Sequence, residues 1–203
     1  MDKLGLNTAE LCYQSYDFAA AISGKFSGAQ KELSDIVGRK IPYIPCQAHR
    51  CNTVIEHSCN SSTLVCAMFD TIQELYVFFT SSTKKFQPLK DQVGEVEKSL
   101  MLRNLSKTRW SARAESVQAA WTSFEAIVAV LEHIGGNPDI DMMNQTKASG
   151  LKKKMLDLDF NASIMFMKNI MYKSKHLVEK LQEVDLNVLD AAVLVEATMK
   201  VLD

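Results

Sequence analysis

Two short pieces of the sequence decide the predicted fold: Tyr16-Asp17-Phe18-Ala19-Ala20-Ala21-Ile22-Ser23-Gly24-Lys25-Phe26-Ser27-Gly28 and Cys46-Gln47-Ala48-His49. Each piece follows a short run that favours β-structure and precedes a helical pattern. The resulting order of strand, helix, strand and helix is typical of an α/β fold. Because open α/β sheets hold their sites at the carboxyl ends of the strands, we expect Asp17, Cys46 and His49 to lie at neighbouring strand ends.

The two predicted strands are short and flank one helix. They are Leu11-Cys12-Tyr13 and Ile41-Pro42-Tyr43-Ile44-Pro45-Cys46, and the prolines favour a sheet edge or a strand end for the second. Between them, apolar residues recur at helical spacing from Ile22 to Ile36, and Gly38 is a C-terminal stop signal. These residues predict a small α/β segment.

After about residue 60 the pattern becomes helical. Apolar stripes at helical spacing run from Val65 to Phe79 and from Val117 to Leu131. We expect helices over about 111–134, 143–157, 160–182 and 186–202, and no convincing strand. The sequence therefore predicts two domains, a partial α/β segment over 1–60 and an all-helical domain over 61–203, with a chain that is mostly α overall.

The composition is that of a folded globular protein. The chain has 203 residues, of which 47% are hydrophobic and 23% are charged. No apolar run reaches the roughly 18 residues that span a bilayer, and no signal peptide precedes the first predicted helix. The odd number of cysteines, five, favours reduced thiols in the cytosol or nucleus.

The charge is unevenly distributed. The net charge is −1, so the chain lacks the overall basic character of many nucleic-acid-binding proteins. From Lys84 to Arg113, however, eight basic residues stand against three acidic ones, which leaves a local charge of +5. Such a segment is either a solvated helix face with a loop or a surface that contacts phosphates.

Asp17 is a candidate metal ligand. A carboxylate at a strand end can hold a divalent ion for phosphoryl transfer, but such sites use two or three carboxylates. The alternative is an aspartate that caps the following helix.

Five residues that could bind zinc lie within fourteen positions: Cys46, His49, Cys51, His57 and Cys59. The paired spacing of a four-ligand zinc site is absent, and His49 and Cys51 would point to different faces of a helix. The alternatives are a catalytic Cys–His pair and, more economically, packing cysteines with a histidine held for orientation.

The run Thr108-Arg109-Trp110-Ser111 precedes a long predicted helix. Tryptophan and arginine together can stack an unpaired base and hold its phosphate. The alternative is a tryptophan packed in the bundle, with Ser111 as the helix N-cap.

Taken in order, these pieces resemble the hAT-superfamily transposase domain in its domesticated form, as in zinc finger MYM-type proteins. Those proteins carry Tyr-Asp-Gly-Ala-Ala-Asn-Met-Ser-Gly, where this chain has the segment from Tyr16 to Gly24. They then carry Cys-x-x-His before a helix with an asparagine, here Cys46, His49 and Asn52, and later Thr-Arg-Trp, here Thr108-Arg109-Trp110. The likeness covers almost the whole chain and implies a ribonuclease H-like fold interrupted by a helical insertion.

The resemblance also implies roles for single residues. Asp17 matches the second of the three acidic residues that hold Mg or Mn in active relatives. Cys46 and His49 would be neighbours of the active site, while Arg109 and Trp110 would face DNA. We expect the first catalytic aspartate before the start of this chain and the last catalytic glutamate after its end. The chain is therefore predicted to be a middle fragment with Asp17 as a remnant, without catalysis and without a cofactor.

The predicted function is that of an inactive fragment of a domesticated hAT-type transposase, located in the nucleus or alternatively in the cytoplasm. It would act as a DNA-binding or protein-interaction module. The competing hypothesis is a structural protein–protein interaction domain without nucleic-acid binding. Expected partners are DNA, another protein or a second copy of the chain, with no membrane and no small-molecule substrate. The candidate nucleic-acid contacts are Lys84, Lys85, Lys107, Arg109, Trp110 and Arg113.

Overall fold

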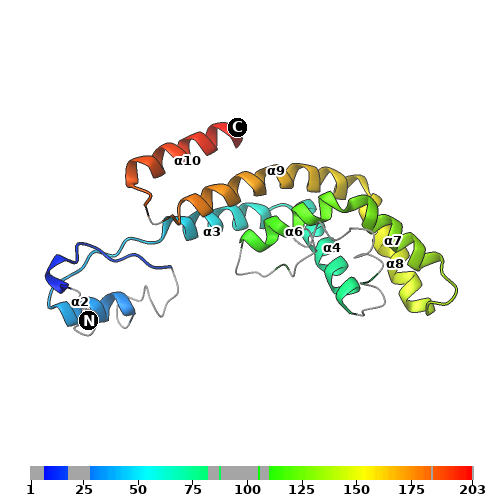
Figure 1. Cartoon of the computed structure of the whole chain (residues 1–203), viewed down its shortest axis with the longest axis horizontal. Coiled ribbons are helices and arrows are strands. Elements are labelled where there is room, and N and C mark those ends of the chain that lie inside the picture. The colour runs from blue at the N-terminus through cyan, green and yellow to red at the C-terminus, as the bar shows by residue number, and fades with distance from the viewer. Residues whose placement is uncertain are drawn as a thin grey trace.

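The structure, a computed structural model, describes residues 7–17, 28–81, 87, 105, 110–183 and 185–202. Within these ranges the chain is almost entirely helical (Figure 1). In the described ranges one short 3-10 helix precedes eight α-helices, with these bounds: η2 (Thr8–Glu10), α2 (Ala29–Val37), α3 (Gln47–Asn60), α4 (Thr63–Thr80), α6 (Trp110–Thr122), α7 (Phe124–Gly136), α8 (Met142–Leu156), α9 (Leu158–Lys180) and α10 (Val188–Leu202).

The predicted α/β fold is wrong, because the described residues form no sheet. The two β-prone segments do run side by side, but they make a single isolated parallel bridge, between Gln14 and Tyr43. Their backbone hydrogen bonds are Gln14 N to Pro42 O, Ile44 N to Gln14 O and Cys46 N to Tyr16 O, each 2.9 Å. This part of the chain therefore does not form a ribonuclease H-like segment.

Proline explains why this pairing stops. Ile44 and Cys46 donate to Gln14 and Tyr16, so the next donor in the same register is residue 42. Pro42 has no N–H, and the ladder cannot extend toward Cys12. Pro45 removes a donor on the opposite edge, which disfavours a third strand there.

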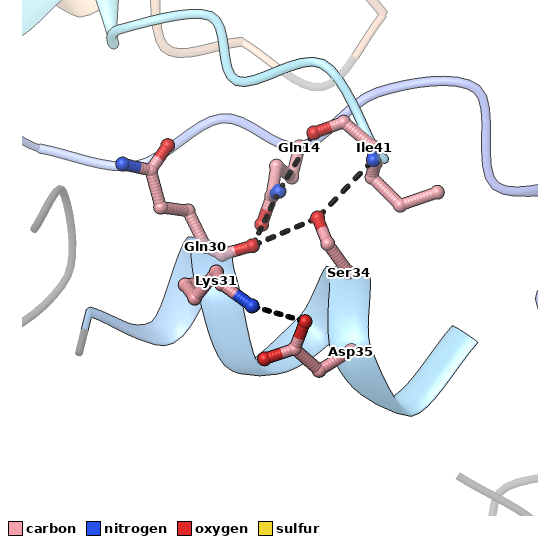
Figure 2. Close-up of polar contacts among 6 residues, drawn as sticks. All are labelled: Gln14, Gln30, Lys31, Ser34, Asp35 and Ile41. Carbon is pink, nitrogen blue, oxygen red and sulfur yellow. Dashed lines mark hydrogen bonds and ion pairs between the residues drawn. The ribbon is translucent and has the colours of Figure 1, made fainter. Parts of the chain in front are cut away.

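A set of hydrogen bonds holds α2 against both extended segments (Figure 2). The side-chain amide of the buried Gln14 donates to Gln30 O and to Ile41 O, each at 3.0 Å. The Ser34 hydroxyl donates to Gln30 O at 3.0 Å and accepts from Ile41 N at 3.1 Å. Helix α2 ends as predicted at Gly38, which adopts the left-handed conformation with φ of 74°.

The prediction of helices after residue 60 is confirmed for the described residues. Helix α9, 23 residues long, runs through the bundle, and α3, α4, α6, α8 and α10 all pack against it (Figure 1). Its predicted apolar face is buried, including Phe160, Ile164, Met167 and Met171. Together with side chains of α4, α6, α7 and α8, this face forms one hydrophobic core.

Two details differ from the predicted helices. The single helix expected over 111–134 is two helices, α6 and α7, separated at Ser123. The break lets α6 pack on α9 while α7 packs mainly on α8. Helix α3, which the predicted boundary at residue 60 assigns to the first domain, packs on α4 and α9.

Candidate functional site

The structure brings Asp17 and Cys46 to the same end of the two paired segments. Cys46 N donates to Tyr16 O at 2.9 Å, and the Tyr43 hydroxyl donates to Asp17 O at 2.7 Å. The rings of Tyr16 and Tyr43 stack with centroids 6.5 Å apart. His49 lies one turn inside α3 and is exposed, as is Asp17. The expected proximity of Asp17 and Cys46 thus arises from two paired segments and not from a sheet.

These residues do not assemble into a metal-binding group. In the ranges that the structure describes, no three His, Cys, Asp or Glu side chains are placed to hold an ion. Burial raises the pKa of the Cys51 thiol, and it raises the pKa of Cys59 to about 11, an effect that Arg113 partly opposes. Both thiols are therefore protonated at neutral pH, which suits packing better than nucleophilic attack.

Most of the predicted nucleic-acid contacts lie outside the described residues. This holds for Lys84, Lys85, Lys107 and Arg109. Trp110 is described only as the first residue of α6.

Arg113 is described, and its guanidinium has partners inside the protein. Its Nη2 lies 3.3 Å from Glu56 Oε1 of α3, and its Cζ lies 5.3 Å from the ring centroid of Phe69 in α4. Only 12% of its side chain is exposed. These contacts compensate its charge and tie α6 to α3 and α4.

Among the described residues, an apolar groove lies between α3, α4 and α9, with a volume of about 500 Å³. We call it the α3–α9 groove. Apolar side chains of all three helices line it, among them Val54, Ile55, Leu64, Phe166, Met167 and Ile170. Val54, Leu64 and Phe166 are large apolar side chains that remain exposed, and Phe166 is 64% exposed. Exposed apolar side chains that gather around a groove are candidate contacts for another molecule.

One side of the groove is basic. Arg50 and His57 are exposed on α3, one turn on either side of Val54. Lys173 extends the groove face of α9 one turn beyond Ile170, and its Nζ donates to Val201 O of α10 at 2.8 Å. Glu56, the nearest acidic residue along α3, points away from this side because it pairs with Arg113. The groove therefore combines an apolar floor with basic side chains along its α3 edge.

The sequence contained a signal for this groove. Helix α9 has apolar residues on the buried face of Phe160, Ile164 and Met171, and again on a second face at Phe166 and Ile170. A helix that is apolar on two faces needs a partner for each. The sequence prediction assigned only the first face.

No protein-family model matches the sequence, and no solved structure matches the fold. Among the described helices, none is both long enough and apolar enough to cross a membrane. The chemistry of the α3–α9 groove is therefore the basis for a functional proposal.

Proposed function

We propose that this chain is a protein-interaction module that binds an amphipathic helix of a protein partner in the α3–α9 groove. The observation that carries this proposal is the exposed apolar lining of the groove around Phe166. A helix that lays an apolar stripe into such a groove removes these side chains from water. Full burial of one large apolar side chain contributes about 1.5–3 kcal/mol, so a few anchors suffice for specific binding.

The charge around the groove indicates the chemistry of the partner. Arg50 and His57 flank Val54 at the α3 edge of the groove, and no ion pair of the described residues occupies either side chain. A helix with acidic residues beside its apolar stripe would complement this edge and gain a faster association rate. Acidic flanks are therefore part of the proposed partner.

The internal pairing of Arg113 favours this function over DNA binding. Arg113 is the one predicted nucleic-acid contact whose side chain is described, and Glu56 and Phe69 already satisfy it. Binding to phosphates would require giving up those contacts. DNA binding stays the competing hypothesis. It rests on the remaining predicted contacts, which are Lys84, Lys85, Lys107, Arg109 and Trp110.

The motifs around Asp17, Cys46 and Trp110 support a further proposal about origin. The module would descend from an hAT-type transposase, work without catalysis and act in the nucleus. This origin is compatible with a protein-interaction role, because binding a partner helix does not require a metal site.

A titration with a fluorescent helical peptide tests the function. The peptide carries leucines at every fourth position and glutamates beside them, and a scrambled peptide of identical composition is the reference. We expect saturable binding of the ordered peptide, measured by fluorescence anisotropy. Phe166→Glu should weaken this binding at least about tenfold, since 1.4 kcal/mol corresponds to tenfold and one anchor contributes more.

Met143→Glu is the matched control, because Met143 is 62% exposed on α8, away from the groove. It should leave the affinity unchanged. Equal binding of ordered and scrambled peptides, or an unchanged affinity of the Phe166→Glu chain, would contradict the proposal. Duplex DNA in the same assay addresses the competing hypothesis, since binding that weakens steeply with salt is typical of phosphate contacts.

A further inference from the structure

Helix α10 carries a second apolar surface that the rest of the described chain leaves uncovered. Leu189, Val193, Ala197 and Val201 recur at every fourth position and form one stripe along the helix. Val193 is 67% exposed, and the other three side chains are exposed as well. Among the described side chains of α10, none is buried. The helix also packs against α9, and outside the stripe Leu194 and Val195 are half-buried.

We propose that the groove of one chain receives the α10 stripe of a second copy, so that two chains form a closed dimer. This proposal rests on the proposed function, because it names the helix that occupies the α3–α9 groove. Both halves of the contact, a groove and an apolar helical stripe, are then present on every chain.

The position of α10 favours a closed pair over an open fibre. The hydrogen bond from Lys173 Nζ to Val201 O places the end of α10 beside α9, about one turn beyond the groove residue Ile170. Two copies related by a two-fold axis near this point can each lay α10 along the groove of the other. A two-fold arrangement makes the same contact twice and leaves no stripe unpaired.

Charge complementarity supports the same occupant. Asp190 and Glu196 lie on opposite borders of the α10 stripe, and Lys200 lies on the same border as Glu196. Glu196 pairs within its own helix with Lys200 at 2.8 Å, but both side chains are exposed, and such surface pairs contribute little. With Val201 near the two-fold axis, Glu196 comes about one and a half turns further along the groove, beside Arg50 and His57 of the other chain. The carboxylate of Glu196 thus meets the basic side chains at the α3 edge of the groove.

The molecular mass in solution is the first test. We expect sedimentation equilibrium of the full chain to give twice the mass of 22.7 kDa. Val193→Glu and Phe166→Glu, which alter the stripe and the groove separately, should each give the mass of a single chain. Met143→Glu, the control with comparable exposure, should remain a dimer. A single-chain mass for the unaltered protein, or a dimer that survives Val193→Glu, would overturn the proposal.

A charge-exchange experiment distinguishes loss of the dimer contact from a failure of the variant to fold. Arg50→Glu should weaken the dimer at least tenfold, and Arg50→Glu combined with Glu196→Arg should restore most of that loss. Restoration requires that the two positions face each other, which a folding defect would not produce. Additive weakening in the double variant would overturn the proposed arrangement.

A further experiment distinguishes the dimer proposal from the proposed function. The free α10 peptide, residues 187–202, is added to the full-length Val193→Glu chain. If the groove binds α10, we expect this peptide to bind, and we expect the additional substitution Phe166→Glu to abolish the binding. If this peptide fails to bind while the designed acidic helix binds, the dimer proposal fails and the interaction function stands. If neither peptide binds, both proposals fail.

Discussion

Residues 7–46 and the helices from α3 to α9 are stabilised by different interactions. In the described part of the first region, Ile41 and Gln14 are the only buried side chains, and hydrogen bonds of Gln14, Ser34 and Arg39 connect its segments. In the helices, more than twenty buried apolar residues form one core. A region that is held by a few hydrogen bonds should unfold locally, whereas helices that share one core should unfold together.

The largest expected effect is in the shared core. Phe79 of α4 is almost fully buried, and Phe79→Ala should lower the free energy of unfolding by about 3–5 kcal/mol. Urea denaturation followed by circular dichroism measures this loss. Val77→Ala, at an exposed position of the same helix, should change the free energy by less than about 0.5 kcal/mol. Similar losses at both positions would mean that the core does not control stability.

A smaller and local effect is expected from Gln14→Leu. The substitution removes the amide donor to Ile41 O and one of the two side-chain donors to Gln30 O, which keeps its bond from Ser34, at a loss of about 1–3 kcal/mol. Hydrogen exchange should become faster at the Ile44 and Cys46 amides, which join the two extended segments. Exchange in α9 should stay the same. Faster exchange in both places would show that the two regions unfold together.

The smallest expected effect concerns pH. The pKa of Cys59 is raised from 9.0 to about 11 by burial, so the unfolded chain releases this proton at lower pH than the folded one. Stability from this group is therefore fully present below pH 9.0 and declines as the pH rises toward 11. Cys59→Ala should flatten that decline relative to the unaltered chain. Cys12, exposed in the first region, should react much faster with a thiol reagent at pH 8 than Cys59.

The helices after residue 60 could be predicted because the spacing of apolar residues is a local property. The stop at Gly38 also followed from one residue type. That the described residues form no sheet was harder to predict from the sequence. Pro42 and Pro45 were recognised as edge signals, but whether further strands would pair with these segments depends on contacts far apart in the sequence.

The candidate site could likewise be predicted only in part from the sequence. The sequence singled out Asp17 and Cys46 as neighbours, and the described backbone brings them to one end of the paired segments. It could not indicate that Arg113 pairs with Glu56, because these residues lie 57 positions apart on different helices. The α3–α9 groove was missed for the same reason, since its lining comes from three separate helices.

The sequence by itself determined where the helices of the bundle form, which of their faces are apolar and where α2 ends. These features depend on the period of the backbone and on the conformational freedom of single residues. Only the tertiary structure decided that the β-prone segments make one bridge, that Ser123 separates α6 from α7 and that the second apolar face of α9 lies open beside α3. These outcomes depend on which distant faces meet, and a local pattern does not contain that information.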